Sequence, residues 1–296
     1  MVNTPTRHRI LIIGIVLSIA ALFLFGSGFV LALGTMLEPG SALRQADGNM
    51  LDRGTEGKTF RQEKRSASEM PRPWPQLIVA LGDSLARGIG DDGTGGFVGR
   101  LRKLLPSDQH DVPAVINLAV SGATSKDLLQ KLSQPGVSET VGQADLLLVS
   151  IGGNDAFPDL AVLDQVKNDR SQHLEVERME PAALDAYHER LDQAVKTLRS
   201  YNHAAPIFLI GLYDPFYDVQ ELRRVSLSAV HAWNGVIEAV AAVNEEVYVV
   251  PTYDIMQLGG SAYLSGDHFH PSALGYAAIA DRLLTTVKTY AILHHR

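Results

Sequence analysis

Three residues of this sequence have the chemistry and the spacing of a nucleophilic site. Ser84 places a hydroxyl directly after an apolar run, and Asp267 and His270 lie three residues apart near the C-terminal end. A serine hydroxyl becomes a good nucleophile when a histidine takes its proton, and a carboxylate then orients that histidine. We therefore predict that Ser84 attacks an acyl carbonyl, with His270 as base and Asp267 as the orienting acid.

Acyl transfer also needs hydrogen-bond donors for the oxyanion of the tetrahedral intermediate. The backbone N–H groups of Ser84 and Gly122 and the side-chain amide of Asn154 are the donors that the sequence offers. Each of these residues also has a purely structural interpretation. Ser84, Asn154 and Asp267 are typical helix caps, and Gly122 is typical of a turn. Their combination favours the catalytic interpretation.

These residues follow elements that alternate between strand and helix. Short apolar runs predict five strands, at Leu77–Leu81, Val115–Leu118, Leu146–Ile151, Ile207–Gly211 and Val247–Val250. Helical patterns occupy Phe97–Leu105, Ser125–Leu132, Pro181–Tyr201, Leu222–Val243 and Pro271–Leu293, with Pro271 expected in a first helical turn. Such alternation predicts a three-layer α/β/α domain whose parallel strands are buried on both faces. The carboxyl edge of that sheet would gather the reactive residues.

The four reactive segments resemble the blocks of the SGNH (GDSL-type) hydrolase family, in order and spacing. They are Gly82-Asp83-Ser84, the segment around Gly122, Gly152-Gly153-Asn154-Asp155, and Asp267-His268-Phe269-His270-Pro271. The resemblance implies a flavodoxin-like five-stranded parallel sheet and metal-independent ester hydrolysis, without a cofactor. It assigns Ser84, Asp267 and His270 to catalysis and Ser84, Gly122 and Asn154 to the oxyanion hole. Gly211–Phe216 and Trp233-Asn234 further resemble the membrane-anchored lipase/acylhydrolase branch of Gram-positive bacteria.

Neighbouring polar residues have competing interpretations. His268 lies two residues from His270, but His270 precedes a proline at the family's spacing from Asp267, so we expect His268 to be a pocket or surface residue. Asp267, His268 and His270 also suit zinc by ligand type, although Ser84 would then be idle. We expect Asp83 to brace the turn before the nucleophile and Asp155 to be structural.

The first 75 residues of the chain have a different character. Residues 1–9 are basic, and residues 10–33 contain no charge, a length of about 36 Å as a helix, which spans a bilayer core of about 30 Å. We predict a transmembrane signal anchor at 10–36, with the N-terminus cytoplasmic; a cleaved signal peptide is the alternative. Residues 37–75 are polar and rich in glycine and charge, as in a flexible extracytoplasmic stalk. Residues 76–296 would form the hydrolase domain.

Composition excludes several classes of function. The chain has no cysteine, which removes disulfides, thiol nucleophiles and cysteine metal sites. The net charge is −7, and the part after residue 75 holds 17 basic and 27 acidic residues. A domain of that charge repels nucleic acid. No protein partner can be inferred, and the oligomeric state is open.

We expect a serine esterase or lipase that acts on acyl esters, such as lysophospholipids, at the outer face of a membrane. Two alternatives stay open: an O-acetyl esterase or O-acyltransferase for cell-wall carbohydrate, and an inactive surface-binding module. Residues 156–180 follow Asn154 directly and lack a clear periodicity. They would form either a mobile flap over the site or a plain surface excursion.

Overall fold

The computed structural model describes residues 74–91, 93–106, 112–158, 181–217, 219–220 and 222–294. The expected anchor at 10–36, the stalk up to residue 73 and most of the expected flap at 156–180 lie outside these residues. Among the residues that are described, no helix combines the length and apolar character needed to cross a membrane.

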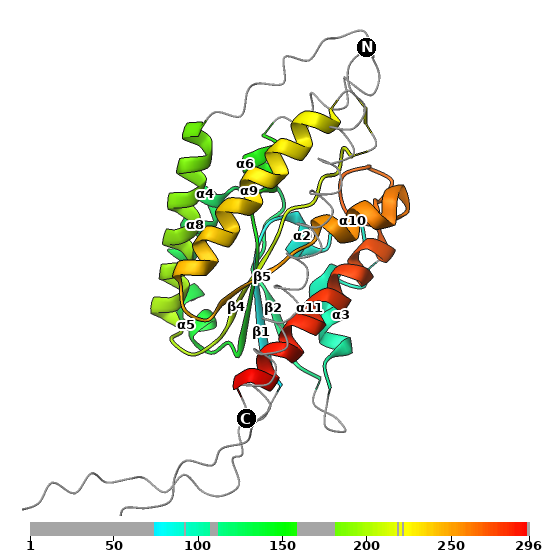
Figure 1. Ribbon diagram of the computed structural model, residues 1–296. Helices are drawn as coiled ribbons and strands as arrows, with labels where there is room; N and C mark the ends of the chain where they lie inside the picture. The colour runs from blue at the N-terminus through cyan, green and yellow to red at the C-terminus, as the bar shows by residue number, and fades with distance from the viewer. Residues whose placement is uncertain are drawn as a thin grey trace, which may run out of the picture. The chain divides into compact units, whose positions relative to one another are not determined.

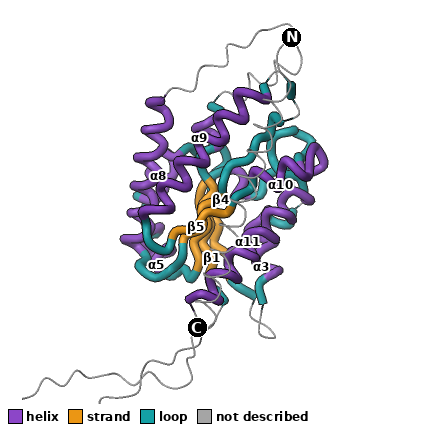
Figure 2. Tube along the Cα trace, in the orientation of Figure 1, coloured by secondary structure: helices purple, strands orange, loops and turns teal. Residues whose placement is uncertain are grey.

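Five parallel strands form the centre of the domain (Figures 1 and 2). Their order across the sheet is β2 (Ala114–Asn117), β1 (Leu77–Gly82), β3 (Leu146–Ser150), β4 (Ile207–Ile210) and β5 (Val247–Val250). This 2-1-3-4-5 order is flavodoxin-like, as predicted. The chain leaves β1 toward β2 on one side and later returns to β3 on the other. Loops therefore diverge above the carboxyl ends of β1 and β3, where open α/β sheets bind ligands.

Helices cover both faces of the sheet and complete the three predicted layers (Figure 1). On one face lie α4 (Ser125–Leu132), α5 (Val137–Gly142), α8 (Pro181–Tyr201) and α9 (Arg223–Val243). The other face carries α2 (Ser84–Arg87), α3 (Gly96–Leu104), α10 (Tyr253–Gly259) and α11 (Ala273–His294). Alternate residues of β1 supply the two cores: Val79 and Leu81 enter one, and Ile78 and Ala80 enter the other. The short elements α6 (Gly153–Ala156) and η1 (Gly260–Tyr263) lie in the connections.

Several details differ from the sequence-based expectations. The predicted strand Val115–Leu118 begins one residue earlier and is exposed or half-buried throughout, because β2 is an edge strand. The last helix begins at Ala273, since Pro271 pairs with Leu264 in an isolated bridge. Helices α5 and α10 were not predicted, and both are too short to show a helical period.

Candidate active site

Strand β1 places Ser84 at the carboxyl edge of the sheet through a turn that requires glycine. Gly82 has a φ of +118°, and a Cβ built there would lie 1.7 Å from the carbonyl oxygen of Ser150. Asp83 follows as the cap of α2, its carboxylate accepting a hydrogen bond of 3.0 Å from the Leu85 N–H. Ser84 is then the first residue of α2 and is 6% exposed.

The structure brings Ser84, His270 and Asp267 into one hydrogen-bonded chain. The Oγ of Ser84 lies 2.8 Å from Nε2 of His270, and Nδ1 of the same ring lies 2.6 Å from Oδ2 of Asp267. A carboxylate only accepts hydrogen bonds, so Nδ1 carries the ring proton and Nε2 is left to accept from the serine hydroxyl. This arrangement allows His270 to take the Ser84 proton.

Asp267 is held as an anion by its own loop. Partial burial alone would raise its pKa, but hydrogen bonds from His270, from the Phe269 N–H and from the Ser265 hydroxyl lower the pKa well below its ordinary value of 3.8. The loop closes on itself, because the Ser265 N–H donates to the His270 carbonyl at 2.8 Å. A side chain that is 46% exposed therefore keeps a defined position beside the imidazole.

Asp83 occupies a contrasting environment directly behind the nucleophile. Burial raises its pKa from 3.8 to about 7, although hydrogen bonds from the Leu85 N–H and the Ser150 hydroxyl act in the opposite direction. The Ser150 hydroxyl donates to Oδ1 at 3.1 Å, so the carboxylate links the ends of β1 and β3. This is the bracing role predicted for Asp83.

The three expected oxyanion donors come from three different loops. Among the described residues, no acceptor takes the N–H of Ser84 or of Gly122, and both remain available to a ligand. Gly122 has a φ of +80°, and a Cβ there would meet no atom within 4 Å. The amide of Asn154 donates one hydrogen to the carbonyl of Ala123 at 2.9 Å, which leaves its second hydrogen free. Their action on an oxyanion stays a prediction.

A second contact joins the same two loops. Asp155 accepts the hydroxyl hydrogen of Ser125 at 2.6 Å and the Ser125 N–H at 2.8 Å. Ser125 is 1% exposed and the Asp155 side chain is 8% exposed, so water does not compete strongly. Together with the Asn154–Ala123 bond, this clamp fixes the turn that carries Gly122 relative to the loop that carries Asn154.

An apolar cavity lies beside Ser84 and Asn154. Its remaining walls are mostly apolar and come from Leu85, Phe157, Leu212, Tyr213, Pro215 and Phe269. The hydroxyl of Tyr213 donates to the carbonyl of Phe269 at 2.7 Å, which ties the loop after β4 to the loop of the histidine. The cavity has a volume of about 20 Å³, so it presents an apolar surface beside Ser84 and does not enclose a large substrate group.

His268 lies outside this arrangement. It is exposed and has a φ of +57°, in agreement with a surface position. The described residues contain no group of three or more histidine, aspartate or glutamate side chains arranged to hold a metal ion, and both ring nitrogens of His270 already have partners. The zinc interpretation therefore has no support from the geometry.

The roles of Ser125, Ser265 and Tyr213 at the site were not predicted from the sequence. The hydroxyls of Ser125 and Tyr213 bond to partners in other loops, and the hydroxyl of Ser265 bonds to Asp267 within its own loop. The Asp–Ser pair is 30 residues apart and the Tyr–Phe pair 56, so no spacing rule reveals them. Ser265 is the exception, since it lies two residues before Asp267 and a short polar turn there would have been a signal.

The sheet order and the loops at its carboxyl edge define the SGNH hydrolase fold. The model of the GDSL-like lipase/acylhydrolase family matches residues 80–278, and the chain belongs to this family.

Relatives with similar sequences and structures support this membership. YpmR of Bacillus subtilis (strain 168) is 31% identical over 235 residues, which cover 78% of this chain and 89% of that protein. The spore germination lipase LipC of Bacillus licheniformis is 27% identical over 206 residues, which cover 69% and 93% of the two chains. The solved lipase Lip_vut3 from a goat rumen metagenome superposes with a TM-score of 0.55 at 25% identity, covering 71% and 96%.

Proposed function

We propose that this chain is a metal-independent serine ester hydrolase with Ser84 as nucleophile. The observation that carries the proposal is the hydrogen-bonded chain from Ser84 Oγ through the imidazole of His270 to Asp267, at 2.8 and 2.6 Å. This order of groups is what general-base activation of a serine requires. Membership of the GDSL-like lipase/acylhydrolase family supports the same chemistry.

In the proposed mechanism, Ser84 Oγ bonds to the acyl carbon while its proton passes to Nε2 of His270. The carbonyl electrons move to oxygen, and the N–H groups of Ser84 and Gly122 with the Asn154 amide bind the resulting oxyanion. The bond to the alcohol then breaks, and that oxygen takes the proton from His270. Water enters next, and its oxygen bonds to the acyl carbon while one of its protons passes to Nε2 of His270. The bond from the acyl carbon to Ser84 Oγ then breaks, Oγ takes the proton back from His270, and the acid leaves.

The test is turnover of p-nitrophenyl octanoate by Ser84→Ala and Asn154→Ala variants of the full chain. Ser84→Ala should abolish enzymatic turnover, and labelling of the wild type by a fluorophosphonate should disappear with it. Asn154→Ala should lower kcat by about 10²–10³-fold, the usual effect of one oxyanion donor. Wild-type turnover by Ser84→Ala would disprove the mechanism, and absent labelling of the wild type would favour the inactive binding module.

The proposed substrates are acyl esters of lipids, including lysophospholipids. The apolar side chains of Phe157, Leu212 and Phe269 beside Ser84 offer a surface on which an acyl chain could lie, and the cavity that they line has a volume of about 20 Å³. The matching relative from Bacillus licheniformis is named a spore germination lipase, which agrees with this class. A faster reaction with an acetylated glycan than with an octanoyl ester would favour the carbohydrate O-acetyl esterase, and acyl transfer to a sugar in competition with water would favour the transferase.

The proposed location is the outer face of a cell membrane, with the uncharged residues 10–33 as anchor and the basic residues before them in the cytoplasm. Cell fractionation tests it. The chain should sediment with membranes, and protease added to intact protoplasts should degrade the hydrolase domain. Recovery of the chain in the soluble cytoplasmic fraction would contradict the proposal.

A further inference from the structure

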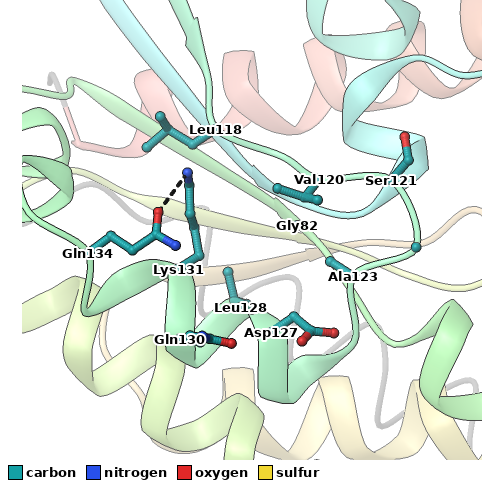
Figure 3. A pocket seen from close by; sticks show the side chains of 11 residues that line it. Gly82, Leu118, Val120, Ser121, Ala123, Asp127, Leu128, Gln130, Lys131 and Gln134 are labelled. Atoms are coloured by element: carbon teal, nitrogen blue, oxygen red, sulfur yellow. Dashed lines mark hydrogen bonds between the residues drawn. The ribbon is translucent and has the colours of Figure 1, made fainter.

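A groove of about 290 Å³ begins at Gly122 and runs between the loop after β2 and helix α4. Its apolar surface comes from Leu118, Val120 and Leu128 (Figure 3). Val120, in the loop that follows the edge strand β2, is 51% exposed although it is apolar. The lining residues of the groove differ from those of the apolar cavity beside Ser84.

The rim of the groove is polar and includes the cation of Lys131. Gln130, Lys131 and Gln134 line it from α4 and the residues that follow. The ammonium of Lys131 donates to the side-chain oxygen of Gln134 at 3.1 Å, as Figure 3 shows, and forms no ion pair with a carboxylate of the described residues. An ammonium has three donors, so two remain for a ligand.

Asp127 also lines the groove, but its carboxylate is already engaged. It accepts the N–H of Thr124 at 2.9 Å and the Thr124 hydroxyl at 2.7 Å in the capping box of α4. These hydrogen bonds lower its pKa, so it stays ionised and bound to the helix end. Asp127 therefore keeps a negative charge in the groove wall, and Lys131 is the cation of the lining that can bind an anionic ligand.

The position of Gly122 connects this groove to the reaction. In the tetrahedral intermediate the acyl carbon is bonded to Ser84, and its oxyanion would face the Gly122 N–H. Its two other substituents, the hydrocarbon of the acid and the alcohol oxygen, would point in different directions. The apolar side chains of Phe157 and Phe269 beside Asn154 offer a surface to the hydrocarbon of the acid, although the cavity between them has a volume of only about 20 Å³. The groove, with its polar rim, suits the alcohol.

We propose that this groove binds the alcohol portion of the ester and that Lys131 selects alcohols that carry a phosphate. The inference rests on the proposed ester hydrolysis at Ser84. When the bond between the acyl carbon and the alcohol oxygen breaks, that oxygen takes the proton of His270, and the phosphate-bearing alcohol departs along the groove. Because the part of the chain after residue 75 has 27 acidic and 17 basic residues, attraction of an anion depends on such a local cation.

Two substrates with the same acyl chain test this selection: 1-octanoylglycerol 3-phosphate and 1-octanoylglycerol. Lys131→Met should lower kcat/KM for the phosphate ester by about fivefold, the range of a partly exposed charge pair, and leave the neutral ester unchanged. Lys126→Met is the matched control, since Lys126 is an exposed lysine of the same helix that does not line the groove. It should change neither substrate.

Three results would overturn the inference: equal loss on both substrates with Lys131→Met, no loss on either, or an equal effect of Lys126→Met. Failure to cleave the phosphate ester while p-nitrophenyl octanoate is hydrolysed would also overturn it. With each of these results, hydrolysis of p-nitrophenyl octanoate by the wild type would still depend on Ser84. Wild-type turnover of p-nitrophenyl octanoate by Ser84→Ala would instead disprove the underlying ester-hydrolase proposal.

Discussion

The clamp between Asp155 and Ser125 leads to a prediction about catalysis from a residue that does not touch the reacting atoms. Asp155 accepts two hydrogen bonds from Ser125, at 2.6 and 2.8 Å, in a buried environment. In Asp155→Asn one oxygen becomes an amide nitrogen, so Ser125 loses one of its two acceptors. A hydrogen bond to a charged group contributes about 1.5–3 kcal/mol, and we expect the free energy of unfolding to fall by about that amount.

The same change should also lower the kcat of the molecules that remain folded. Ser125 lies three residues after Gly122, and its bond to Asp155 helps to hold the Gly122 N–H beside the site. A displacement of about 1 Å in a positioned group can cost about 10²-fold in rate. We therefore expect kcat for p-nitrophenyl octanoate to fall about 10- to 100-fold, with KM changed little, because the donor acts on the oxyanion and not on the bound ester.

Asp192→Asn is the matched control. Asp192 also accepts two hydrogen bonds, from Lys196 at 2.6 Å and Asn244 at 3.1 Å, but it lies on α8 and lines neither the cavity nor the groove. The control should lose stability and keep its kcat, measured at a temperature where both variants are folded. If Asp155→Asn keeps wild-type kcat while its unfolding temperature falls, the clamp only stabilises the fold and the reasoning is refuted.

Three further predictions concern the residues around the nucleophile. The pKa of Asp83 is about 7 in the folded chain against 3.8 as the ordinary value, so the folded state binds the extra proton and stability should fall as pH rises from about 4 to 7. Asp83→Asn should flatten this dependence in urea unfolding at pH 5 and 8; an unchanged slope would contradict the shifted pKa. Gly82→Ala should give little soluble folded protein, because its Cβ would overlap the Ser150 carbonyl, and a wild-type circular dichroism melt would show that β1 can move. Tyr213→Phe removes the hydrogen bond to the Phe269 carbonyl and should lower kcat by a few fold with little change in melting temperature, whereas wild-type kcat would show that the histidine loop needs no such support.

Local patterns were enough to predict most of the fold. The bounds of α4 and α8 are those predicted, because an apolar period continues to a clear end in both segments. The five strands were found because each parallel strand is a short apolar run, and the sheet order is the one that the family resemblance implied. The prediction failed at β2, where sequence cannot show that a strand lies at the edge and stays exposed.

The reactive residues were also predicted from short segments of the sequence. Asp267 and His270 lie in one short loop, so their hydrogen bond follows from chain geometry. Three glycine-containing segments indicated the positions of Ser84, Gly122 and Asn154. The sequence by itself therefore determined the fold class, the family and the list of reactive groups.

Only the tertiary structure decided how these groups are held. The bond between Ser84 and His270 joins residues 186 apart. The Asp155–Ser125 clamp joins the loops that follow β2 and β3, the two strands that flank β1 in the sheet. Lys131 has an available charge because the folded chain places no carboxylate against it among the described residues. Such contacts depend on how distant segments pack, and burial and pairing of a side chain are properties of that packing and not of the residue type.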